Sequence, residues 1–308
     1  MIRAARVGAG VWLVVVLTGC SMVSLGYPRL PDLGVLWVQR QVSLEHAQAD
    51  ALKQDLSGLL PGPRQHQLGP TADLLHRWQG MAHTDLSADQ VCEEFDTVRD
   101  LLRDLAWQAL PAMTRLGRSL HASQHQEWAQ AQQKSHTEFR ETYLDTTPAR
   151  SWLGQAQATI SGHASHPTGI SPAGLEKRLS QATERYSMLY GKLTAEQLRT
   201  LQQAFNQSIF DPRRMLAERE RRTQDLMQIL IQMESAATEA QAQALMRGWL
   251  ERLLMPPAPA QQAHHQALAR EGCTQLARIH QLATPEQRRH AATTLGRYGT
   301  ELRQLATR

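Results

Sequence analysis

Apolar residues recur at three- and four-residue spacing along most of this chain, which is the period of an amphipathic α-helix. The repeat is clearest in two stripes of the second half: Leu175, Leu179, Ala182, Tyr186, Leu189 and Leu193, then Leu226, Ile229, Leu230 and Met233. No stretch alternates Val, Ile, Thr and Tyr as a β-strand does. Each apolar stripe needs a partner helix, so the pattern predicts an all-α, multi-helix bundle.

Breaks in the pattern place the helix boundaries. We expect a helix that is capped by Ser43 and ends near Gly58. Further helices are expected over residues 33–42, 71–82, 87–109, 112–121, 123–144, 240–254, 260–282 and 285–306. Residues 146–174 are rich in Ser, Gly, Pro and Thr and predict a loop or linker. This loop would separate an N-terminal helical half, 33–145, from a C-terminal half, 175–308, and the two are expected to pack as one domain.

The first residues resemble a lipoprotein signal peptide. Arg3 and Arg6 precede a short apolar run, and the processing site follows as Leu17, Thr18, Gly19 and Cys20. Residues 1–19 would be removed, residues 20–32 would form a lipidated tether, and diacylglycerol and an N-acyl chain on Cys20 would anchor the protein. An uncleaved anchor helix is the alternative, although the apolar run is short for a bilayer.

Ser21 follows the lipidated cysteine. By resemblance to the sorting rule of Gram-negative lipoproteins, a residue other than Asp at this position implies the outer membrane, facing the periplasm. After Cys20 no run of 18 apolar residues predicts a second membrane pass. The protein is therefore expected to contact the membrane through the lipid on Cys20 alone. No cofactor other than this lipid is predicted.

The charges are nearly balanced once the leader is set aside. Without Arg3 and Arg6 the mature chain has 31 Lys and Arg against 29 Asp and Glu, which argues against nucleic-acid binding. Cys92 and Cys273 are the thiols left after lipidation of Cys20. In an oxidising compartment this pair predicts a disulfide, with two separately buried cysteines as the alternative.

Three segments have the pattern of a helix-capping box. Each places a hydroxyl residue at the N-cap and a Gln three residues later: Ser87 with Gln90, Thr194 with Gln197, and Thr284 with Gln287. Leu86 with Val91 and Leu193 with Leu198 would add hydrophobic staples. We therefore predict three helix starts here.

The same L-T-x-x-Q pattern resembles the motif of the small periplasmic chaperones and stress regulators of the Spy type. The resemblance implies a chaperone or stress-adapter role. The three segments lie 107 and 90 residues apart, which is no regular repeat, so helix capping is the preferred interpretation.

A second resemblance covers more of the mature chain. The order of its motifs is similar to a family of helical proteobacterial lipoproteins known as a domain of unknown function: Gly19-Cys20, Leu25-Gly26-Tyr27, Glu184-Arg185-Tyr186, Tyr190-Gly191-Lys192-Leu193-Thr194, Asp211-Pro212, Ala217-Glu218-Arg219 and Thr284-Pro285-Glu286-Gln287-Arg288. This resemblance implies a helical fold and an envelope location but no reaction. The aromatic-rich helix that such proteins have after the tether is represented mainly by Trp37.

Two groups of polar residues are candidates for ligand binding. His121 and His125 have the spacing of zinc ligands, but a helix start at Ser123 and the lack of an implied third ligand favour solvated histidines, and no metal is predicted. The densest basic segment could contact anionic lipid or glycan: Arg213, Arg214, Arg219, Arg221 and Arg222. Glu218 and Glu220 interrupt it, which favours an ordinary ion-paired helix face.

The motifs of the common hydrolase, nucleotide-binding and dinucleotide-binding sites do not occur, and no catalytic residue is predicted. The leading hypothesis is a non-enzymatic, outer-membrane-anchored periplasmic lipoprotein that acts by binding an envelope protein, glycan or lipid, or by supporting the envelope. The alternatives are a periplasmic chaperone or stress adapter, and a helical cell-wall enzyme.

Overall fold

The computed structural model describes residues 26–60, 62, 66–144 and 168–307. The signal peptide, the processing site with Cys20, and most of the loop predicted over 146–174 lie outside the described residues. Within the described part of the first half, a short 3₁₀ helix and six α-helices follow one another: η1 Tyr27–Arg29, α3 Leu30–Gln39, α4 His46–Leu59, α6 Leu68–Met81, α7 Ala88–Gln108, α8 Leu110–Ser119 and α9 Ala122–Tyr143.

The described part of the second half adds six more α-helices and no strand: α11 Pro172–Tyr190, α12 Ala195–Asn206, α13 Pro212–Glu234, α14 Glu239–Leu254, α15 Pro259–Gln281 and α16 Pro285–Ala306. An isolated pairing of Leu144 with Ile170 brings the two halves together beside the segment between them. The predicted all-α, multi-helix fold is confirmed.

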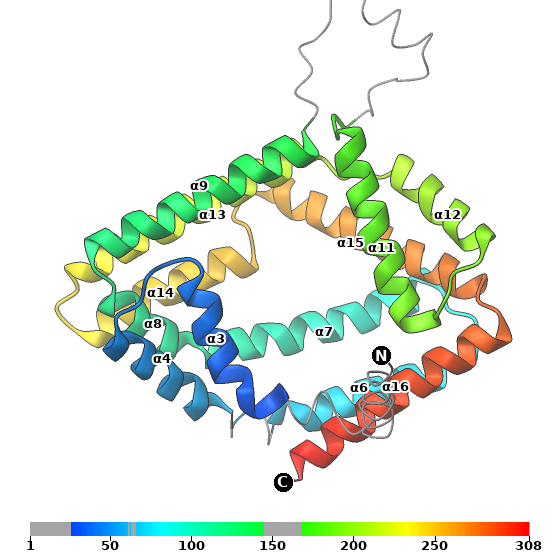
Figure 1. The fold of residues 1–308 in the computed structure, drawn as a ribbon, viewed down its shortest axis with the longest axis horizontal. Helices are drawn as coiled ribbons and strands as arrows, with labels where there is room; N and C mark the ends of the chain where they lie inside the picture. Colours follow the sequence, from blue (N-terminus) through cyan, green and yellow to red (C-terminus); the bar gives the residue numbers. More distant parts are fainter. Residues whose placement is uncertain (1–25, 61, 63–65, 145–167, 308) are drawn as a thin grey trace, which may run out of the picture.

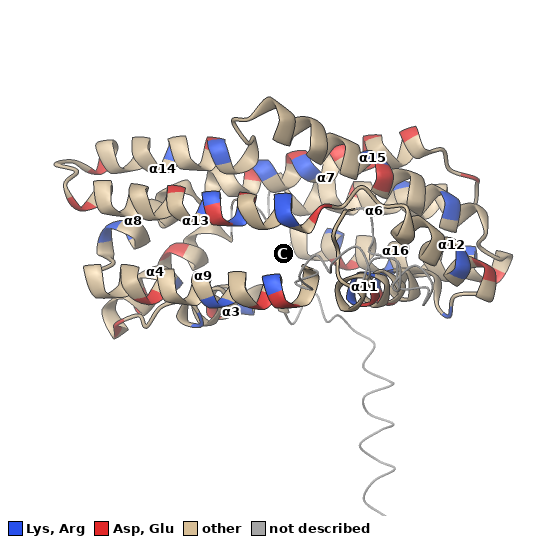
Figure 2. Cartoon of the chain, turned by 90° about the horizontal axis from the view of Figure 1, so that it is seen from above, with Lys and Arg blue, Asp and Glu red and all other residues tan. Residues whose placement is uncertain are grey.

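The helices are arranged as a frame around a central opening (Figure 1). α9 and α13 lie side by side along one edge, α11 and α15 border the next, and α7 runs along the opposite edge. Seen from above, the molecule is flat, with α7, α14 and α15 in one layer and α3, α9 and α11 in the other (Figure 2). Basic and acidic residues are interspersed along the helices in this view (Figure 2).

The buried apolar residues form separate clusters and not one central core. The largest lies where α11, α12, α15 and α16 meet, with Leu201 and Ile279 fully buried. A second joins α8, α13 and α14 around Leu110, Met233 and Leu250. These clusters lie on opposite sides of the opening (Figure 1), because each set of helices buries its apolar faces locally.

Contacts between several helix pairs and a disulfide join the two halves of the chain. α6 and α16 form the most extensive pairing of helices in the described structure. Cys92 of α7 and Cys273 of α15 form the disulfide that the sequence predicts, with their Cα atoms 5.4 Å apart. The N-terminal and C-terminal halves are therefore joined both by packing and by a covalent bond.

Several predicted boundaries are wrong. Residues 27–32 of the tether predicted over 20–32 are helical, and Tyr27 is buried with its hydroxyl donating to the carbonyl of Leu60 at 3.0 Å. The cap of α4 is Glu45 and not Ser43, whose backbone N–H instead donates to Glu127 of α9 at 2.8 Å. A long-range contact thus competes with the local capping pattern.

Other helices start earlier than their apolar periodicity suggests. α6 begins at Leu68 and not Thr71, and α9 begins at Ala122 after an N-cap at His121, not at Ser123. α8 and α11 both include a proline in their first turn, Pro111 and Pro172, a position that proline tolerates because its missing N–H has no partner there. The C-terminal half therefore begins at Pro172, within the predicted loop.

Candidate binding site

Capping boxes fix the corners of the helical frame. In six helices the Gln at the third position accepts a hydrogen bond from the backbone N–H of the N-cap residue: Gln48, Gln90, Gln124, Gln197, Gln241 and Gln287. The predicted boxes at Ser87, Thr194 and Thr284 are all present, and each hydroxyl accepts the N–H of its own Gln at 3.2 Å. These bonds satisfy backbone groups that a helix start leaves open.

Two of these glutamines bind each other across a corner. The Nε2 of Gln197 donates to the Oε1 of Gln287 at 3.1 Å, and the Nε2 of Gln287 donates back at 3.0 Å. Each amide also donates to a backbone carbonyl of the other corner segment, Gln197 to Ile279 and Gln287 to Lys192. The starts of α12 and α16 are thereby locked together in a buried site.

The same arrangement occurs on the other side of the molecule. Gln48 and Gln124 exchange amide hydrogen bonds of 3.0 and 2.7 Å, and Gln124 also donates to the carbonyl of Ser43. Sequence reasoning missed this pair because the N-caps are Glu45 and His121, residue types that seldom begin helices. The signal that could have found it is the Gln three residues after each cap.

Leu198, expected to complete a staple with Leu193, is instead 40% exposed. Leu193 itself is buried in the large cluster, where tertiary packing replaces the local contact. Leu86 and Val91 do lie in one cluster with Cys273.

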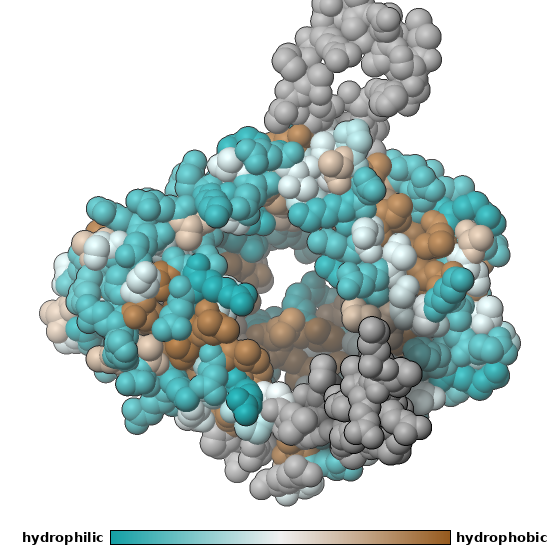
Figure 3. All heavy atoms as spheres, viewed as in Figure 1, coloured by the Kyte–Doolittle hydropathy of each residue, from teal (hydrophilic) through white to brown (hydrophobic). Residues whose placement is uncertain are grey.

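α7, which borders the opening, carries exposed apolar side chains (Figure 1). Phe95, Leu102 and Leu105 are 39%, 60% and 40% exposed and lie near one face of the helix, because they are spaced by seven and three residues. In the space-filling view the opening passes through the molecule without being filled by side chains, and hydrophobic atoms line its lower rim, where α7 runs (Figure 3). A contiguous exposed apolar patch is typical of an interaction site.

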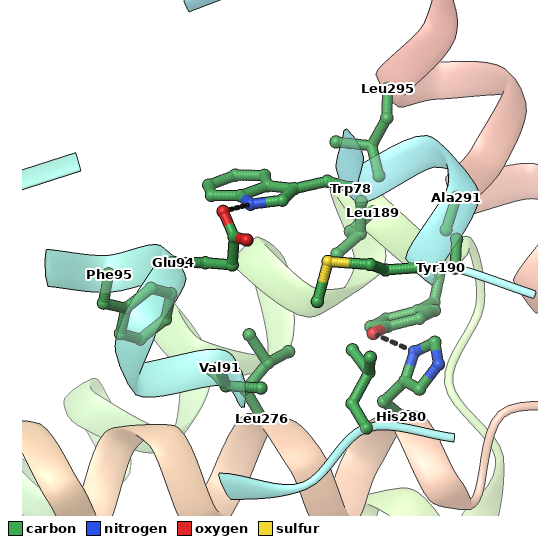
Figure 4. Close-up of a pocket in the computed structure, with 13 residues that line it drawn as sticks. Trp78, Val91, Glu94, Phe95, Leu189, Tyr190, Leu276, His280, Ala291 and Leu295 are labelled. Atoms are coloured by element: carbon green, nitrogen blue, oxygen red, sulfur yellow. Dashed lines mark hydrogen bonds between the residues drawn. The ribbon is translucent and has the colours of Figure 1, made fainter. Parts of the chain in front are cut away.

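An apolar pocket opens at Phe95 and extends between α6, α7, α11, α15 and α16 (Figure 4). Its volume is about 150 Å³. It is lined by thirteen residues, most of them apolar: Trp78, Met81, Ala82, Leu86, Val91, Glu94, Phe95, Leu189, Tyr190, Leu276, His280, Ala291 and Leu295. We call it the apolar pocket.

The carboxylate at the edge of the apolar pocket is held by neighbouring side chains. Glu94 accepts the indole N–H of Trp78 at 2.8 Å and pairs with Arg77 at 3.0 Å. The hydrogen bonds and charge of Arg77 hold the pKa of Glu94 below its usual range. Glu94 is thus ionised, and its carboxylate orients the indole ring of Trp78 by accepting a hydrogen bond. An ionised carboxylate does not act as a proton donor.

The polar groups at the base of the pocket are also paired. The Nε2 of His280 lies 2.7 Å from the carbonyl oxygen of Thr84, which can only accept, so Nε2 carries the proton. The other nitrogen, Nδ1, lies 2.9 Å from the hydroxyl of Tyr190 and accepts from it in the neutral imidazole (Figure 4). Burial lowers the pKa of His280 and raises the pKa of Tyr190, which keeps both side chains neutral.

A second, more polar pocket of about 420 Å³ shares a wall with the apolar pocket. The shared residues are Phe95, Leu189 and Leu276. Its polar lining is Arg178, Arg185, Gln181, Gln275 and the hydroxyl of Tyr186, and it includes no acidic side chain. We call it the arginine pocket.

Arg178 is held rigidly in the arginine pocket. Its guanidinium carbon lies 3.9 Å from the ring centre of Phe210 and 4.9 Å from that of Phe205. Glu271, whose charge acts on Arg178, accepts hydrogen bonds from the hydroxyl of Ser208 and the backbone N–H of Ile209. Burial lowers the pKa of Arg178, although the charge of Glu271 opposes this effect.

The predicted basic segment lies on α13, none of its arginines lines either pocket, and its charges are largely engaged. Buried Glu218 binds Arg221 at 2.8 Å and Arg222 at 2.6 Å, and Asp211 lies 3.5 Å from Arg214. Arg219 donates to the hydroxyl of Ser135 at 2.8 Å. The guanidinium of Arg213 packs against Gly169, at a positive φ of 70°.

The two histidines with zinc spacing contact different carboxylates. His121 lies 3.5 Å from Glu45, whereas Nδ1 of buried His125 lies 3.1 Å from Glu234. Among the residues that the structure describes, no group of three His, Cys, Asp or Glu side chains is placed to hold a metal ion.

No protein family model, curated protein or solved structure matches the chain. The two resemblances noted in the sequence therefore stay predictions. In the part of the chain that the structure describes, no helix combines the length and apolarity needed to cross a membrane.

Proposed function

We propose that this protein is a non-enzymatic binding scaffold that holds an apolar segment of another polypeptide at its central opening. The observation that carries the proposal is the exposed apolar face of α7, a helix that borders the opening, together with the apolar pocket that adjoins this helix at Phe95. Apolar surface on a scaffold with locally buried cores is typical of an interaction site.

The chemistry of the pocket supports binding. Glu94, Tyr190 and His280 are all engaged by protein partners, and burial keeps His280 and Tyr190 neutral. A bound apolar group would gain contact with carbon atoms and would meet no unpaired polar atom among them. This is the arrangement expected of a site that buries a side chain.

The place of action belongs to the same proposal. The lipoprotein signal peptide and the processing site at Leu17 to Cys20 support export, lipidation of Cys20 and anchoring in the outer membrane on the periplasmic side. A protein tethered there would meet exported polypeptides before they fold. Among the alternatives, the chaperone role is therefore favoured over passive envelope support, and the resemblance to Spy-type proteins agrees with it.

Suppression of aggregation by the mature protein tests this proposal. We expect it to keep an unfolding client protein soluble, measured by light scattering, and the double variant Leu102→Gln, Leu105→Gln to lose most of this effect. Leu198→Gln is the matched control, because Leu198 is equally exposed as Leu105 but lies on α12. Equal protection by all three proteins, or none by the wild type, would argue against the proposal. Released fragments from purified peptidoglycan would indicate the cell-wall enzyme instead.

A further inference from the structure

We propose that the two adjoining pockets recognise one feature of the bound polypeptide: a bulky apolar side chain close to an acidic one. This inference rests on the proposed function and gives it a specificity. The apolar pocket would take the apolar side chain, and the arginine pocket would take the carboxylate.

The size and lining of the apolar pocket argue for the first half of the feature. A volume of about 150 Å³ is that of an apolar cavity able to hold a benzene-sized group. The buried polar side-chain atoms without a partner in the described residues are on Gln67, His125 and Glu301, none of which lines this pocket. A polar side chain would therefore lose its water without gaining a hydrogen bond, whereas Leu, Met or Phe would gain contact area.

The charge of the arginine pocket argues for the second half. Arg178 and Arg185 contribute two positive charges to its lining, and no acidic residue lines it. Glu271 lies close enough to act on Arg178 but is already bound by Ser208 and Ile209. Since Arg178 is stacked on Phe205 and Phe210, its position is fixed before a ligand arrives, which lowers the entropic cost of binding a carboxylate.

The shared wall places both halves within one short segment of a ligand. Phe95, Leu189 and Leu276 face both pockets, so the two sites lie on opposite sides of single side chains. Phe95 is also the first of the exposed apolar residues of α7. A polypeptide that lies on this helix at Phe95 would therefore contact the wall that the two pockets share.

Fluorescence anisotropy with four labelled short peptides tests the inference on the full mature protein. The reference peptide has one Phe and one Glu three residues apart among Ser, Gly and Ala, and the others change Phe to Ala, Glu to Gln, or both. We expect Phe to Ala to weaken binding about tenfold and Glu to Gln about fivefold. The Glu preference should disappear in Arg185→Gln, whose side chain is exposed, and remain in Arg199→Gln on α12.

A second variant tests the apolar pocket separately. Leu295→Phe should fill it and abolish the preference for Phe while leaving the preference for Glu. Circular dichroism would confirm that each variant is folded, and Arg178→Gln gives a second measurement of the charge effect should Arg185 alone be too weak.

The outcomes separate this inference from the proposed function. If the wild type binds all four peptides equally while protecting clients, the specificity is wrong and the general proposal stands. If it binds no peptide and protects no client, both are wrong. Displacement of the reference peptide by a fatty acid at lower concentration than by the unlabelled peptide would assign the site to a lipid.

Discussion

At the scale of single residues, the most informative feature is the reciprocal glutamine pair. The side chains of Gln197 and Gln287 each bond the start of their own helix and each other. The C=O and NH2 groups of both amides are therefore engaged at a buried corner. Gln48 and Gln124 repeat the arrangement on the other side. A buried polar group that loses its partner costs more free energy than the bond itself contributes, so these corners should tolerate little change.

We predict that Gln197→Leu lowers the free energy of unfolding by about 2 kcal/mol, because it removes both hydrogen bonds exchanged with the amide of Gln287 and leaves the backbone N–H of Thr194 without its acceptor. The matched control is Gln90→Leu, which removes an exposed capping box and should cost about 1 kcal/mol or less. Urea midpoints measure both. Equal effects at the two sites would mean that the reciprocal pair contributes nothing beyond capping.

Acid should weaken the fold through Glu218. Hydrogen bonds from Arg221 and Arg222 lower the pKa of Glu218 to about 2 from an ordinary value of 4.5. Because the folded value is the lower one, the pairing stabilises the fold above pH 4.5 and is lost as the pH falls toward 2. Both arginines are about one third exposed, so we expect about 2 kcal/mol, less than the full shift implies.

Comparison of the wild type with Glu218→Gln tests this expectation. The variant should be less stable at pH 7, and the difference should shrink between pH 4.5 and pH 2. Glu220→Gln removes a more exposed pair with Arg140 and should change stability by less than about 0.5 kcal/mol. A difference between the wild type and Glu218→Gln that does not depend on pH would contradict the assignment.

The sequence reveals local contacts of this kind and misses the distant ones. Thr194 and Gln197 are three residues apart, so the sequence alone predicts their capping box. The same holds for Glu196 in the first turn of the helix. That Gln197 also binds Gln287, ninety positions away, depends on how the helices meet. The cap at Glu45 was missed for a related reason, because the nearby Ser43 has the better local pattern but is engaged by α9.

At the scale of helices, the pairing of α6 and α16 depends on close approach at two glycines. A Cβ atom built at Gly299 would lie 2.7 Å from the imidazole of His76 and 3.3 Å from the carbonyl oxygen of Ala72. At Gly296 it would meet the flexible end of Gln79. The absence of a side chain at Gly299 therefore permits the close approach of α16 to the backbone of α6.

We predict that Gly299→Leu destabilises the protein by about 2 kcal/mol, because the side chain must push α16 away from α6. Gly272→Ala in α15 is the control: its Cβ would meet nothing within 4 Å, so it should stabilise by about 0.5 to 1 kcal/mol through helix propensity. Thermal unfolding followed by circular dichroism compares the two. A neutral Gly299→Leu would show that the helices separate easily.

Helix positions were easier to predict than helix partners. Boundaries with a Ser or Thr cap, such as those at Ser87 and Thr284, agree with the structure. In contrast, the N-caps of α6 and α9 are Gln67 and His121, which the sequence pattern does not single out. Periodicity identifies a buried face without saying which helix covers it. The exposed face of α7 has the same apolar spacing as a core helix, so the sequence does not distinguish the opening from a core.

At the scale of the whole molecule, the disulfide and the α6–α16 pairing act together to close the frame. Cys273 is buried, and its bond to Cys92 links positions 181 residues apart. The two large apolar clusters, one between α11, α12, α15 and α16 and one between α8, α13 and α14, are separate. Without a further link, the helices around one cluster could unfold while those around the other stay folded. The covalent bond opposes this by restricting the unfolded chain.

We predict that the double variant Cys92→Ala, Cys273→Ala lowers the free energy of unfolding by about 3 to 5 kcal/mol, the range expected for a long closed loop. The wild type in a reducing agent should approach the double variant, and the double variant should not respond to the reducing agent. Denaturant midpoints under both conditions measure this. Stability of the reduced wild type equal to that of the oxidised protein would mean that packing alone holds the halves together.

The disulfide also has a topological consequence. It turns residues 92 to 273 into a closed covalent loop, and α7, α9 and α11 of this loop border three sides of the opening (Figure 1). A linear chain that passed through this closed loop could leave it only by moving along its own length. Local melting of one helix would not free it, so release would require the partner to slide out end first, and a circular partner could not be threaded at all.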